Sequence, residues 1–205
     1  MKRASGFVAY GSRARDYLVS LGASPEDVKI GINTSDTKFF SEKTADIRKR
    51  IHGSGNKKHL TYIGYLVPRK NVFKVLEVVK RLLKFRNDFV LDIIGDGEDK
   101  EKLQNFVRDE NLGEYVIFHG YKQKRDIPDF LAISDCFLFQ TEFDIWGLVL
   151  NEAMAAGVPC LASVHAGATD DLIKEGDTGF IADFDDPEQT AAKISFILDH
   201  REEMT

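Results

Sequence analysis

The feature that most constrains the fold is a regular alternation, from residue 59 onward, between short apolar runs and longer amphipathic segments. The alternation recurs six times along the chain. In order, the pairs are HLTYIG with NVFKVLEVVKRLLKF, FVLDIIG with EDKEKLQNFVRDE, YVIFHG with RDIPDFLAIS, CFLFQT with GLVLNEAMAA, PCLAS with ATDDLIKEG, and TGFIAD with PEQTAAKISFILDH. Apolar runs without polar alternation are typical of strands covered on both faces. The pattern therefore predicts an α/β fold with a doubly wound parallel sheet, Rossmann-like in architecture.

Within this pattern, the segment 71–86 predicts an amphipathic helix whose apolar side chains recur at helical spacing. These side chains are Val72, Val75, Leu76, Val79, Leu82 and Leu83.

The first 58 residues lack the alternation. Residues 6–24 predict the end of a strand and one helix, and residues 26–40 predict a short strand and a loop. Residues 41–58 are polar and contain Gly-Ser-Gly, which predicts a connector or an exposed loop.

Composition excludes several classes of protein. At 205 residues, with 43% hydrophobic residues and a formal charge of −5, the chain reads as an ordinary, mildly acidic folded protein with no nucleic-acid partner. No apolar run approaches the roughly 20 residues that cross a bilayer. The N-terminus leads into mixed sequence rather than a signal peptide, so we expect a cytoplasmic protein without a transmembrane segment. Cys136 and Cys160 lie in apolar runs and are predicted to be buried thiols.

Ligands of open parallel sheets bind where strands end and helices begin, because backbone N–H groups point into the crevice there. At IGYLVPRKN, residues 63–71, a strand ends in Gly64 and a short loop leads to Lys70, which can meet a phosphate. An ordinary surface lysine ahead of a helix is the alternative. At IIGDGEDK, residues 93–100, Gly-x-Gly follows a strand, but Lys100 stands where a dinucleotide fingerprint needs its third glycine. A tight turn with a helix cap explains this segment equally well.

The segment TEFDIWGLVLNEAMAAG, residues 141–157, raises a question of charge. Its helical part is almost wholly apolar, yet it carries Asn151 and Glu152. Burying a carboxylate costs several kcal/mol unless another group pairs with it. Asp144 lies eight positions before Glu152, so both acids can face one crevice. Alternatively, Glu152 pairs with an arginine and Asp144 is an ordinary loop acid. The first amides of this helix, free to bind an anion such as diphosphate, are those of Gly147, Leu148 and Val149.

A fourth junction, SVHAGATDDLI at residues 163–173, brings a glycine-containing loop into a helix. Asp170 and Asp171 are candidates to cap this helix. His165 is expected near the crevice, although a loop histidine is more often incidental.

Together these motifs resemble the donor-binding half of retaining glycosyltransferases with the GT-B fold, the "group 1" or family 4 class. The resemblance covers about residues 59–198, and the segment 29–40 is similar to that family's interdomain linker. The motifs that carry it are GYLVPRKN, IIGDGE, VIFHGY, TEFDIWGLVLNEAMAAGVPCLAS, GATDDLI and GDTGFIADFDDPEQTA. The family motif of Glu, seven residues and Glu, followed by Ala-Met-Ala, places its two acids at Asp144 and Glu152.

The resemblance implies a site for a nucleoside-diphosphate sugar such as a UDP- or GDP-hexose, with no cofactor and no metal ion. Asp144, holding hydroxyls of the transferred sugar, and Lys70, adding charge at the diphosphate, are the implied catalytic residues. Glu152 would bind the ribose. The other implied donor-binding positions are Gly147, Leu148 and Val149 at the diphosphate, Gly64 at the strand end, and Tyr121 and Lys122 at the base.

Two positions depart from the family pattern. Asp144 is one methylene shorter than the usual Glu, which weakens any prediction of the sugar. Tyr65 stands where the family often has Arg, which removes one of two cations expected at the diphosphate. Weaker donor binding, or a cation from another residue such as Arg69, would follow.

A complete enzyme of this kind has two domains of similar size, with catalysis in the cleft between them. Residues 1–40 are predicted to be the remnant of the acceptor domain and the interdomain linker, and residues 41–205 the nucleotide-sugar-binding domain. We therefore expect a fragment of a hexosyltransferase that is inactive without its acceptor-binding domain. Peripheral membrane association of the full enzyme is compatible with this prediction.

Two other functions stay open at this point. A stand-alone nucleotide-binding or regulatory module would share the fold without transferase activity. A dinucleotide-dependent oxidoreductase would share the sheet architecture, but no strand here is followed by a complete Gly-x-Gly-x-x-Gly turn.

Overall fold

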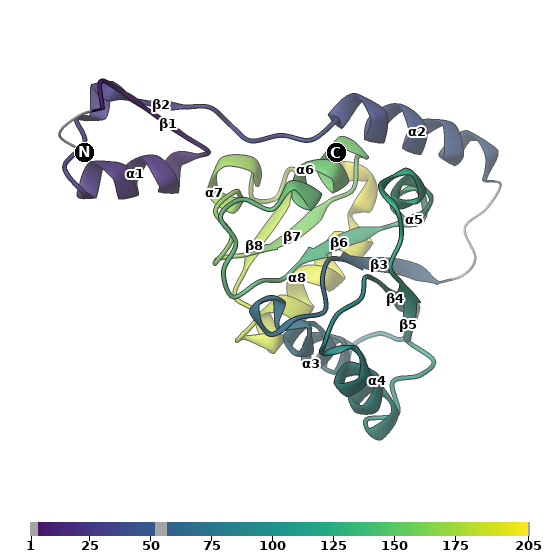
Figure 1. Ribbon diagram of the computed structural model, residues 1–205. Coiled ribbons are helices and arrows are strands. Elements are labelled where there is room, and N and C mark those ends of the chain that lie inside the picture. The colour runs from purple at the N-terminus through teal and green to yellow at the C-terminus, as the bar shows by residue number, and fades with distance from the viewer. Residues whose placement is uncertain (1–3, 52–56, 205) are drawn as a thin grey trace.

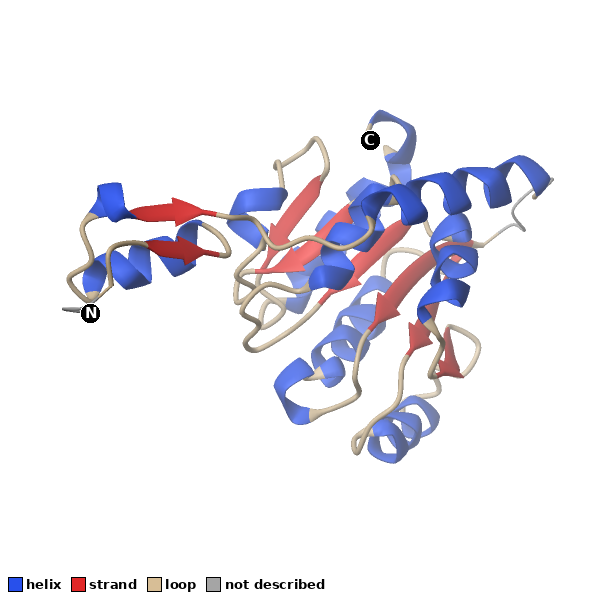
Figure 2. Cartoon of the chain, turned by 45° about the horizontal axis from the view of Figure 1, so that its top comes forward, coloured by secondary structure: helices blue, strands red, loops and turns tan. Residues whose placement is uncertain are grey.

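A six-stranded parallel sheet forms the centre of the molecule (Figures 1 and 2). The computed structural model describes residues 4–51 and 57–204. The sheet has the order β5-β4-β3-β6-β7-β8, which confirms the predicted doubly wound parallel sheet. Its strands are β3 (Lys58–Ile63), β4 (Phe89–Ile94), β5 (Val116–Gly120), β6 (Cys136–Phe139), β7 (Cys160–Ser163) and β8 (Gly179–Ala182).

Helices cover both faces of this sheet, because successive side chains of a strand point to opposite faces. Within β6, Cys136 and Leu138 join one apolar cluster, whereas Phe137 and Phe139 join the other. Both cysteines are buried free thiols, as predicted. The helices on the first side are α3 (Val72–Leu82), α4 (Lys100–Asp109) and α8 (Pro187–Asp199), and those on the second are α5 (Ile127–Ile133) and α6 (Leu148–Ala155), with the single turn α7 (Thr169–Leu172) after β7.

Helix α3 confirms the periodicity argument. Five of its six predicted apolar positions are buried, and Leu83 lies just beyond the helix and is half-buried. Short 3₁₀ turns complete the connections at η1 (Pro25–Asp27), η2 (Pro68–Lys70), η3 (Lys124–Asp126) and η4 (Arg201–Glu203). None of the described helices combines the length and the apolar character that crossing a bilayer requires.

The N-terminal segment forms a small unit of its own beside the main sheet (Figure 1, purple). It contains β1 (Phe7–Ala9), α1 (Ser12–Ser20) and β2 (Val28–Ile30), in agreement with the strand, helix and strand predicted there. The two strands pair in parallel, and their apolar cluster is separate from those of the main sheet.

Helix α2 (Thr37–Arg50) corrects two predictions, the loop expected up to residue 40 and the connector over residues 41–58. Asp36 caps its first turn by accepting a hydrogen bond from the amide of Phe39, and the helix packs against α5 and α6. The centre of the inward face is a stripe of Phe40, Thr44 and Arg48, spaced four residues apart, and Phe39 packs beside it. With only one apolar residue in that stripe, composition concealed the helix. Residues 52–56 of the predicted connector lie outside the described residues.

Counted from β3, the strand order reverses between β3 and β6, which are neighbours in the sheet. Ligands of such sheets bind outside the carboxyl ends of the strands at this point of reversal. The segments that leave these two strands carry Gly64 and Lys70 after β3, and Asp144 and Gly147 after β6.

Candidate functional site

Lys70 and Asp144 meet at this reversal point. Lys70 ends the 3₁₀ turn η2, and its Nζ lies 2.6 Å from Oδ2 of Asp144 in the loop after β6. The lysine side chain is buried, and its ammonium lies 5.0 Å from the centre of the Phe139 ring. The alternative of an ordinary surface lysine is therefore wrong.

Both members of this pair are charged because each supplies the other's counter-ion. Burial acts to raise the pKa of Asp144, but the hydrogen bond and charge of Lys70 outweigh it and hold the pKa below its usual value. Burial lowers the pKa of Lys70, and Asp144 opposes that change. The other carboxylate oxygen, Oδ1, accepts a hydrogen bond of 3.2 Å from the amide of Trp146.

Arg69 brings a second cation to the same carboxylate. Its Nη1 lies 3.5 Å from Oδ2 of Asp144 and donates a 2.5 Å hydrogen bond to the carbonyl oxygen of Phe143. The Arg69 side chain is 49% exposed, whereas that of Lys70 is 9% exposed. Two cations thus converge on one carboxylate, one buried and one open to solvent.

Gly147 is the N-cap of helix α6 and lies three residues after Asp144 in the same loop. The glycine has φ +97°, and a Cβ there would collide with the ring of Phe139. Within the described residues, three amides at this helix start donate to no protein acceptor, and such amides can bind an anion. They are the predicted amides of Gly147, Leu148 and Val149.

The two polar residues inside α6 have different explanations. Asn151 is buried, and its Oδ1 accepts a 2.9 Å hydrogen bond from the indole of Trp146, so it has a protein partner. Glu152 is half-buried, and no hydrogen bond or ion pair with the described residues reaches its carboxylate. Burial raises the pKa of Glu152, and only the charge of Lys124 opposes this. The paired structural acid considered from the sequence is not what the structure shows.

Three other predicted positions share one hollow. Gly64, Tyr121 and Lys122 line a hollow of about 130 Å³ with apolar walls at the ends of β3, β4 and β5. Tyr65 lines it as well and is 68% exposed. Glu152 is not among its lining residues, so the structure places these positions in two neighbouring groups and not in one cavity.

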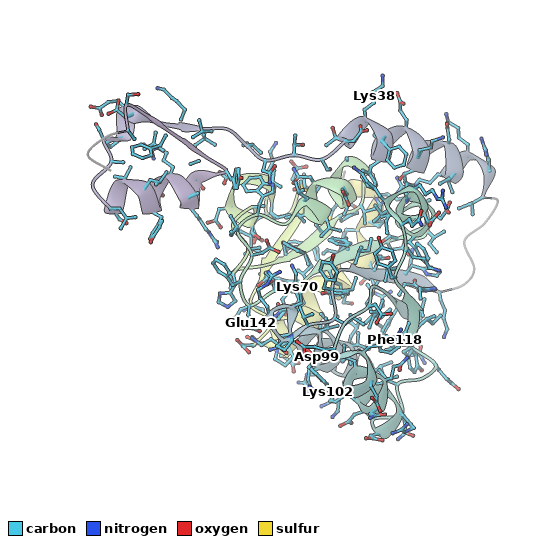
Figure 3. The ribbon with its side chains drawn as sticks, viewed as in Figure 1. Lys38, Lys70, Asp99, Lys102, Phe118 and Glu142 are labelled. Carbon is cyan, nitrogen blue, oxygen red and sulfur yellow. The ribbon has the colours of Figure 1, made fainter. Side chains whose placement is uncertain are left out.

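Glu142 is a site residue that sequence reasoning missed (Figure 3). Its Oε1 accepts hydrogen bonds from Asn71 at 2.9 Å and Gln140 at 3.2 Å, and it pairs with Lys74 at 2.7 Å. Burial acts to raise the pKa of Glu142, but Lys74 and Asn71 lower it overall. This carboxylate links the start of α3 to the loop after β6. In the sequence, only its position two residues before Asp144 indicates such a role.

Asp170 and Asp171 do not cap helix α7, whose N-cap is Ala168 without a side-chain bond. They bind the N-terminal unit instead. Asp171 accepts a 2.8 Å hydrogen bond from the amide of Ser12, and Asp170 pairs with the guanidinium of Arg13. Both acids lie inside the α7 turn and not at its N-cap position, and their side chains bind the amide and the cation that α1 presents.

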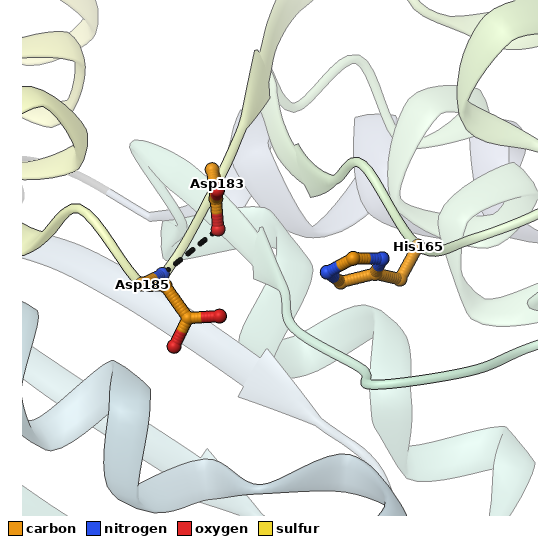
Figure 4. Close-up of side chains that lie close together, drawn as sticks. All are labelled: His165, Asp183 and Asp185. Atoms are coloured by element: carbon orange, nitrogen blue, oxygen red, sulfur yellow. Dashed lines mark hydrogen bonds between the residues drawn. The ribbon is translucent and has the colours of Figure 1, made fainter.

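His165 lies at the rim beside Asp144, where both line a hollow of about 540 Å³ between α1 and the two loops. Its ring also faces two acids, Asp183 and Asp185, and Oδ1 of Asp183 accepts a 3.0 Å hydrogen bond from the amide of Asp185 (Figure 4). All three side chains are exposed, and Asp185 is paired with Lys74 at 2.7 Å. Because a cation already compensates this cluster, we assign no metal to it.

The Gly-x-Gly segment after β4 has a packing role. A Cβ at Gly95 would collide with the backbone of Gly64, and one at Gly97 with that of Leu66. The glycines let the loop after β4 lie against the loop after β3, which is the tight turn considered from the sequence. Asp99, at the N-cap of α4, makes no side-chain capping bond, so the expected side-chain cap is absent there.

Comparison with known families decides what kind of protein carries this site. The sequence model of the family described as "Glycosyl transferases group 1" matches residues 43–205. The chain belongs to this family. The group 1 match begins inside α2 and takes in the whole six-stranded sheet.

Curated relatives of this group 1 chain are named glycosyltransferases. It is 28% identical over 178 residues to N-acetyl-alpha-D-glucosaminyl L-malate synthase of Bacillus anthracis, covering 86% of this chain and 46% of the relative. It is 32% identical over 167 residues to a GDP-mannose-dependent alpha-mannosyltransferase of Corynebacterium glutamicum, covering 80% of this chain and 38% of that protein. The chain thus spans less than half the length of these two relatives.

Solved structures show the same fold for this group 1 chain. The apo lipopolysaccharide outer core galactosyltransferase WaaB superposes with a TM-score of 0.83 at 21% identity, covering 98% of this chain and 55% of WaaB. Anabaena HepE in complex with UDP-glucose superposes with a TM-score of 0.78 at 21% identity, covering 98% of this chain and 56% of HepE. The fold expected from the resemblance, one Rossmann-like half of a GT-B enzyme, is confirmed.

Proposed function

We propose that this chain is the donor-binding part of a retaining glycosyltransferase of family 4, which transfers a hexose from a nucleoside-diphosphate sugar to an acceptor hydroxyl. The observation that carries the proposal is the carboxylate of Glu152. It is half-buried in helix α6, has no partner among the described residues, and belongs to a group 1 chain. A desolvated carboxylate without a partner is costly, and ribose hydroxyls from a bound nucleotide would satisfy it.

The diphosphate belongs at the start of α6 in this proposal. The unpaired amides of Gly147, Leu148 and Val149 and the ammonium of Lys70 supply positive charge there. This charge would stabilise the leaving diphosphate without a metal ion. The absence of a side chain at Gly147 lets the phosphates approach the backbone.

The base and the transferred sugar of the donor would bind at the other predicted positions. The base would lie in the hollow of Gly64, Tyr121 and Lys122, whose walls are mostly apolar. The transferred sugar would lie at Asp144, which borders the larger hollow facing α1. HepE was solved with UDP-glucose, and one relative is GDP-mannose-dependent, which supports a UDP- or GDP-hexose as the donor.

In the reaction we propose, the acceptor hydroxyl attacks the anomeric carbon from the face that the diphosphate leaves. The bond between the anomeric carbon and the phosphate oxygen breaks, and a bond to the acceptor oxygen forms. The acceptor proton passes to an oxygen of the departing diphosphate, so this domain needs no dedicated base. Lys70 and the α6 amides hold the negative charge that develops on the leaving group.

An acceptor-binding domain is the partner that this proposal requires. The chain covers only 55% of WaaB and 46% of the B. anthracis relative. Without the rest, we expect donor binding and no sugar transfer by this polypeptide.

A melting-temperature panel tests the proposal. UDP, GDP, UDP-glucose, GDP-mannose and NAD are each added to the 205-residue chain at graded concentrations. A ligand at about 100 times its Kd adds about 2.7 kcal/mol to the free energy of unfolding, which a melting curve resolves. We expect the melting temperature to rise either with UDP and UDP-glucose or with GDP and GDP-mannose. Stabilisation by NAD alone would contradict the proposal.

A further inference from the structure

We propose that Arg48 and Arg201 form a binding site for a phosphate-type anion, at the edge of the sheet opposite the proposed donor site. Both arginines line a hollow of about 300 Å³, together with Ser134 and Asp135, which directly precede β6. The hollow therefore lies at the amino ends of the parallel strands, whereas the donor positions lie at the carboxyl ends. None of the positions assigned to the donor lines it.

Two neighbouring cations without a contacting counter-ion point to an anion here. Both side chains are half-buried, and neither guanidinium forms an ion pair with any residue that the structure describes. Arg48 donates a 2.7 Å hydrogen bond to the carbonyl oxygen of Ala156, and Arg201 donates one of the same length to that of the next residue. A charge taken out of water is costly unless it is compensated. The carbonyl oxygens compensate in part, and an anion between the two cations would supply the counter-charge.

The pKa values of the two arginines follow from the same arrangement. Burial lowers the pKa of both guanidinium groups, and the charge of Arg201 lowers that of Arg48 further. The charge of Asp135 opposes the change at both arginines without outweighing burial. A further negative charge in the hollow would favour the charged form of each.

The two acids that line the hollow do not provide this charge by contact. Oδ2 of Asp135 accepts a 2.8 Å hydrogen bond from the amide of His59, and Oδ1 lies 3.7 Å from Nζ of Lys58. Glu202 is exposed in the turn η4. Three cations, the two arginines and Lys58, thus stand against two acids and leave one positive charge in excess.

Arg201 also has hydrogen-bond donors left for a ligand. All three nitrogens of the Arg48 guanidinium donate to carbonyl oxygens at the ends of α5 and α6, which fixes that side chain in place. Among residues 4–51 and 57–204, Arg201 donates from Nη2 alone, so its Nε and Nη1 groups are open to a ligand. Arginine binds phosphate oxygens in a fork through two such N–H groups. Arg48 therefore supplies charge, and Arg201 supplies charge and the direct contacts.

NMR titration of the full 205-residue chain tests the site, with the side-chain Nε–H signals of Arg48 and Arg201 as reporters. Inorganic phosphate and glycerol 3-phosphate are added separately, at an ionic strength held constant with sodium chloride. The backbone signal of Gly147 reports any phosphate bound at the start of α6 in the same spectra. We expect the two arginine signals to shift to saturation with a dissociation constant different from that at Gly147. The compound that binds more tightly shows whether the site takes the free ion or a phosphate ester.

Three variants assign the binding to particular charges. Arg201→Gln should weaken it by about tenfold or more, read from the Arg48 signal, because it removes a cation and the fork. Glu202→Gln should tighten it by about twofold to threefold, because an exposed negative charge is lost. Arg125→Gln is the matched control and should change nothing, because that side chain is 76% exposed in η3, outside the hollow.

Absence of a saturating shift at Arg201 in the unmodified chain would overturn the inference. Equal affinity in Arg201→Gln, or weaker binding in Glu202→Gln, would overturn it as well. Thermal melts establish that each variant is folded, and if Arg201→Gln is not, the unmodified chain and Glu202→Gln decide the matter. The proposed donor function is tested separately by nucleotides, so it stands or falls independently of these results.

Discussion

The ammonium of Lys70 lies 2.6 Å from the carboxylate of Asp144, although 74 residues separate them in the chain. Lys70 lies in the segment that follows β3 and Asp144 in the loop that follows β6, so the pair bridges the point where the strand order reverses. The two residues to which the proposed function assigns the phosphate and the sugar are each other's partners in the structure. Under that proposal, we expect donor binding to draw Lys70 toward phosphate and to free Asp144 for sugar hydroxyls.

Removing the acid from this pair should destabilise the fold. Asp144→Asn leaves the buried ammonium of Lys70 without a carboxylate in contact with it. We expect a loss of about 2–3 kcal/mol in the free energy of unfolding. Asp185→Asn is the matched control, because that carboxylate is 63% exposed in its pair with Lys74. Its effect should stay within about 0.5 kcal/mol. Urea denaturation measures both, and equal losses would contradict the buried pairing.

The start of α6 should tolerate no side chain at position 147. Gly147→Ala meets both a left-handed backbone, φ +97°, and the ring of Phe139. We expect a loss of about 2–4 kcal/mol in the free energy of unfolding, together with loss of nucleotide binding. Gly113→Ala is the control, because nothing lies within 4 Å of the Cβ position there and its φ is not left-handed. Unfolding curves that place both variants at the same stability would show that the close approach does not exist.

A carboxylate between two histidines should make stability depend on pH. Asp92 in β4 is 3% exposed and accepts hydrogen bonds from His59 Nδ1 at 2.7 Å and His119 Nε2 at 2.6 Å. The bond to Asp92 raises the pKa of His59, with burial opposing it. A raised folded-state pKa adds stability that is fully present below the ordinary histidine value of about 6.5 and is lost as pH rises through the folded value.

Urea unfolding measured between pH 5.5 and 9 should therefore show stability falling above about pH 6.5. His59→Gln should flatten this fall, because the glutamine does not titrate. His200→Gln, at the end of α8, should keep it. A wild-type curve that rises over this range would contradict the assignment.

Arg48 should anchor helix α2 to the rest of the fold. Its guanidinium donates to the carbonyl oxygens of Leu131 at 3.1 Å, Ala132 at 3.1 Å and Ala156 at 2.7 Å, at the C-terminal ends of α5 and α6. Arg48→Met leaves these carbonyls unpaired and should cost about 2–4 kcal/mol, measured by thermal unfolding. Lys49→Met, next to it and 76% exposed, should cost less than about 0.5 kcal/mol. A smaller effect at Arg48 than at Lys49 would refute the anchoring role.

The main sheet could be predicted because its strands β4, β6 and β7 are buried on both faces. Runs such as those of β4 and β6 are wholly apolar or nearly so, and every residue of both strands is buried. Any strand that is buried in this way is an apolar run without polar alternation, and such a run can be recognised in the sequence. Helix α2 escaped prediction because its inward face contains a threonine and an arginine, which composition assigns to a surface.

The candidate site was predictable only in part. Glu152 stands out from the sequence because it is a carboxylate within an apolar helix, and Gly147 because it directly precedes that helix. The pairing of Lys70 with Asp144 depends on two loop conformations that local sequence does not encode. The partners of Asp170 and Asp171 lie in α1, about 160 residues away in the chain, and no local propensity reports contacts at that separation.

The central claim is that Glu152 is reserved for the ribose of a bound nucleotide. The most direct test compares UDP or GDP, whichever binds more tightly, with its 2′,3′-dideoxy analogue, by calorimetry on the unmodified chain and on Glu152→Ala. We expect the unmodified chain to prefer the ribose form by about tenfold or more, and the variant to bind both forms equally and weakly while remaining folded. A variant that keeps the full preference for ribose would contradict the account.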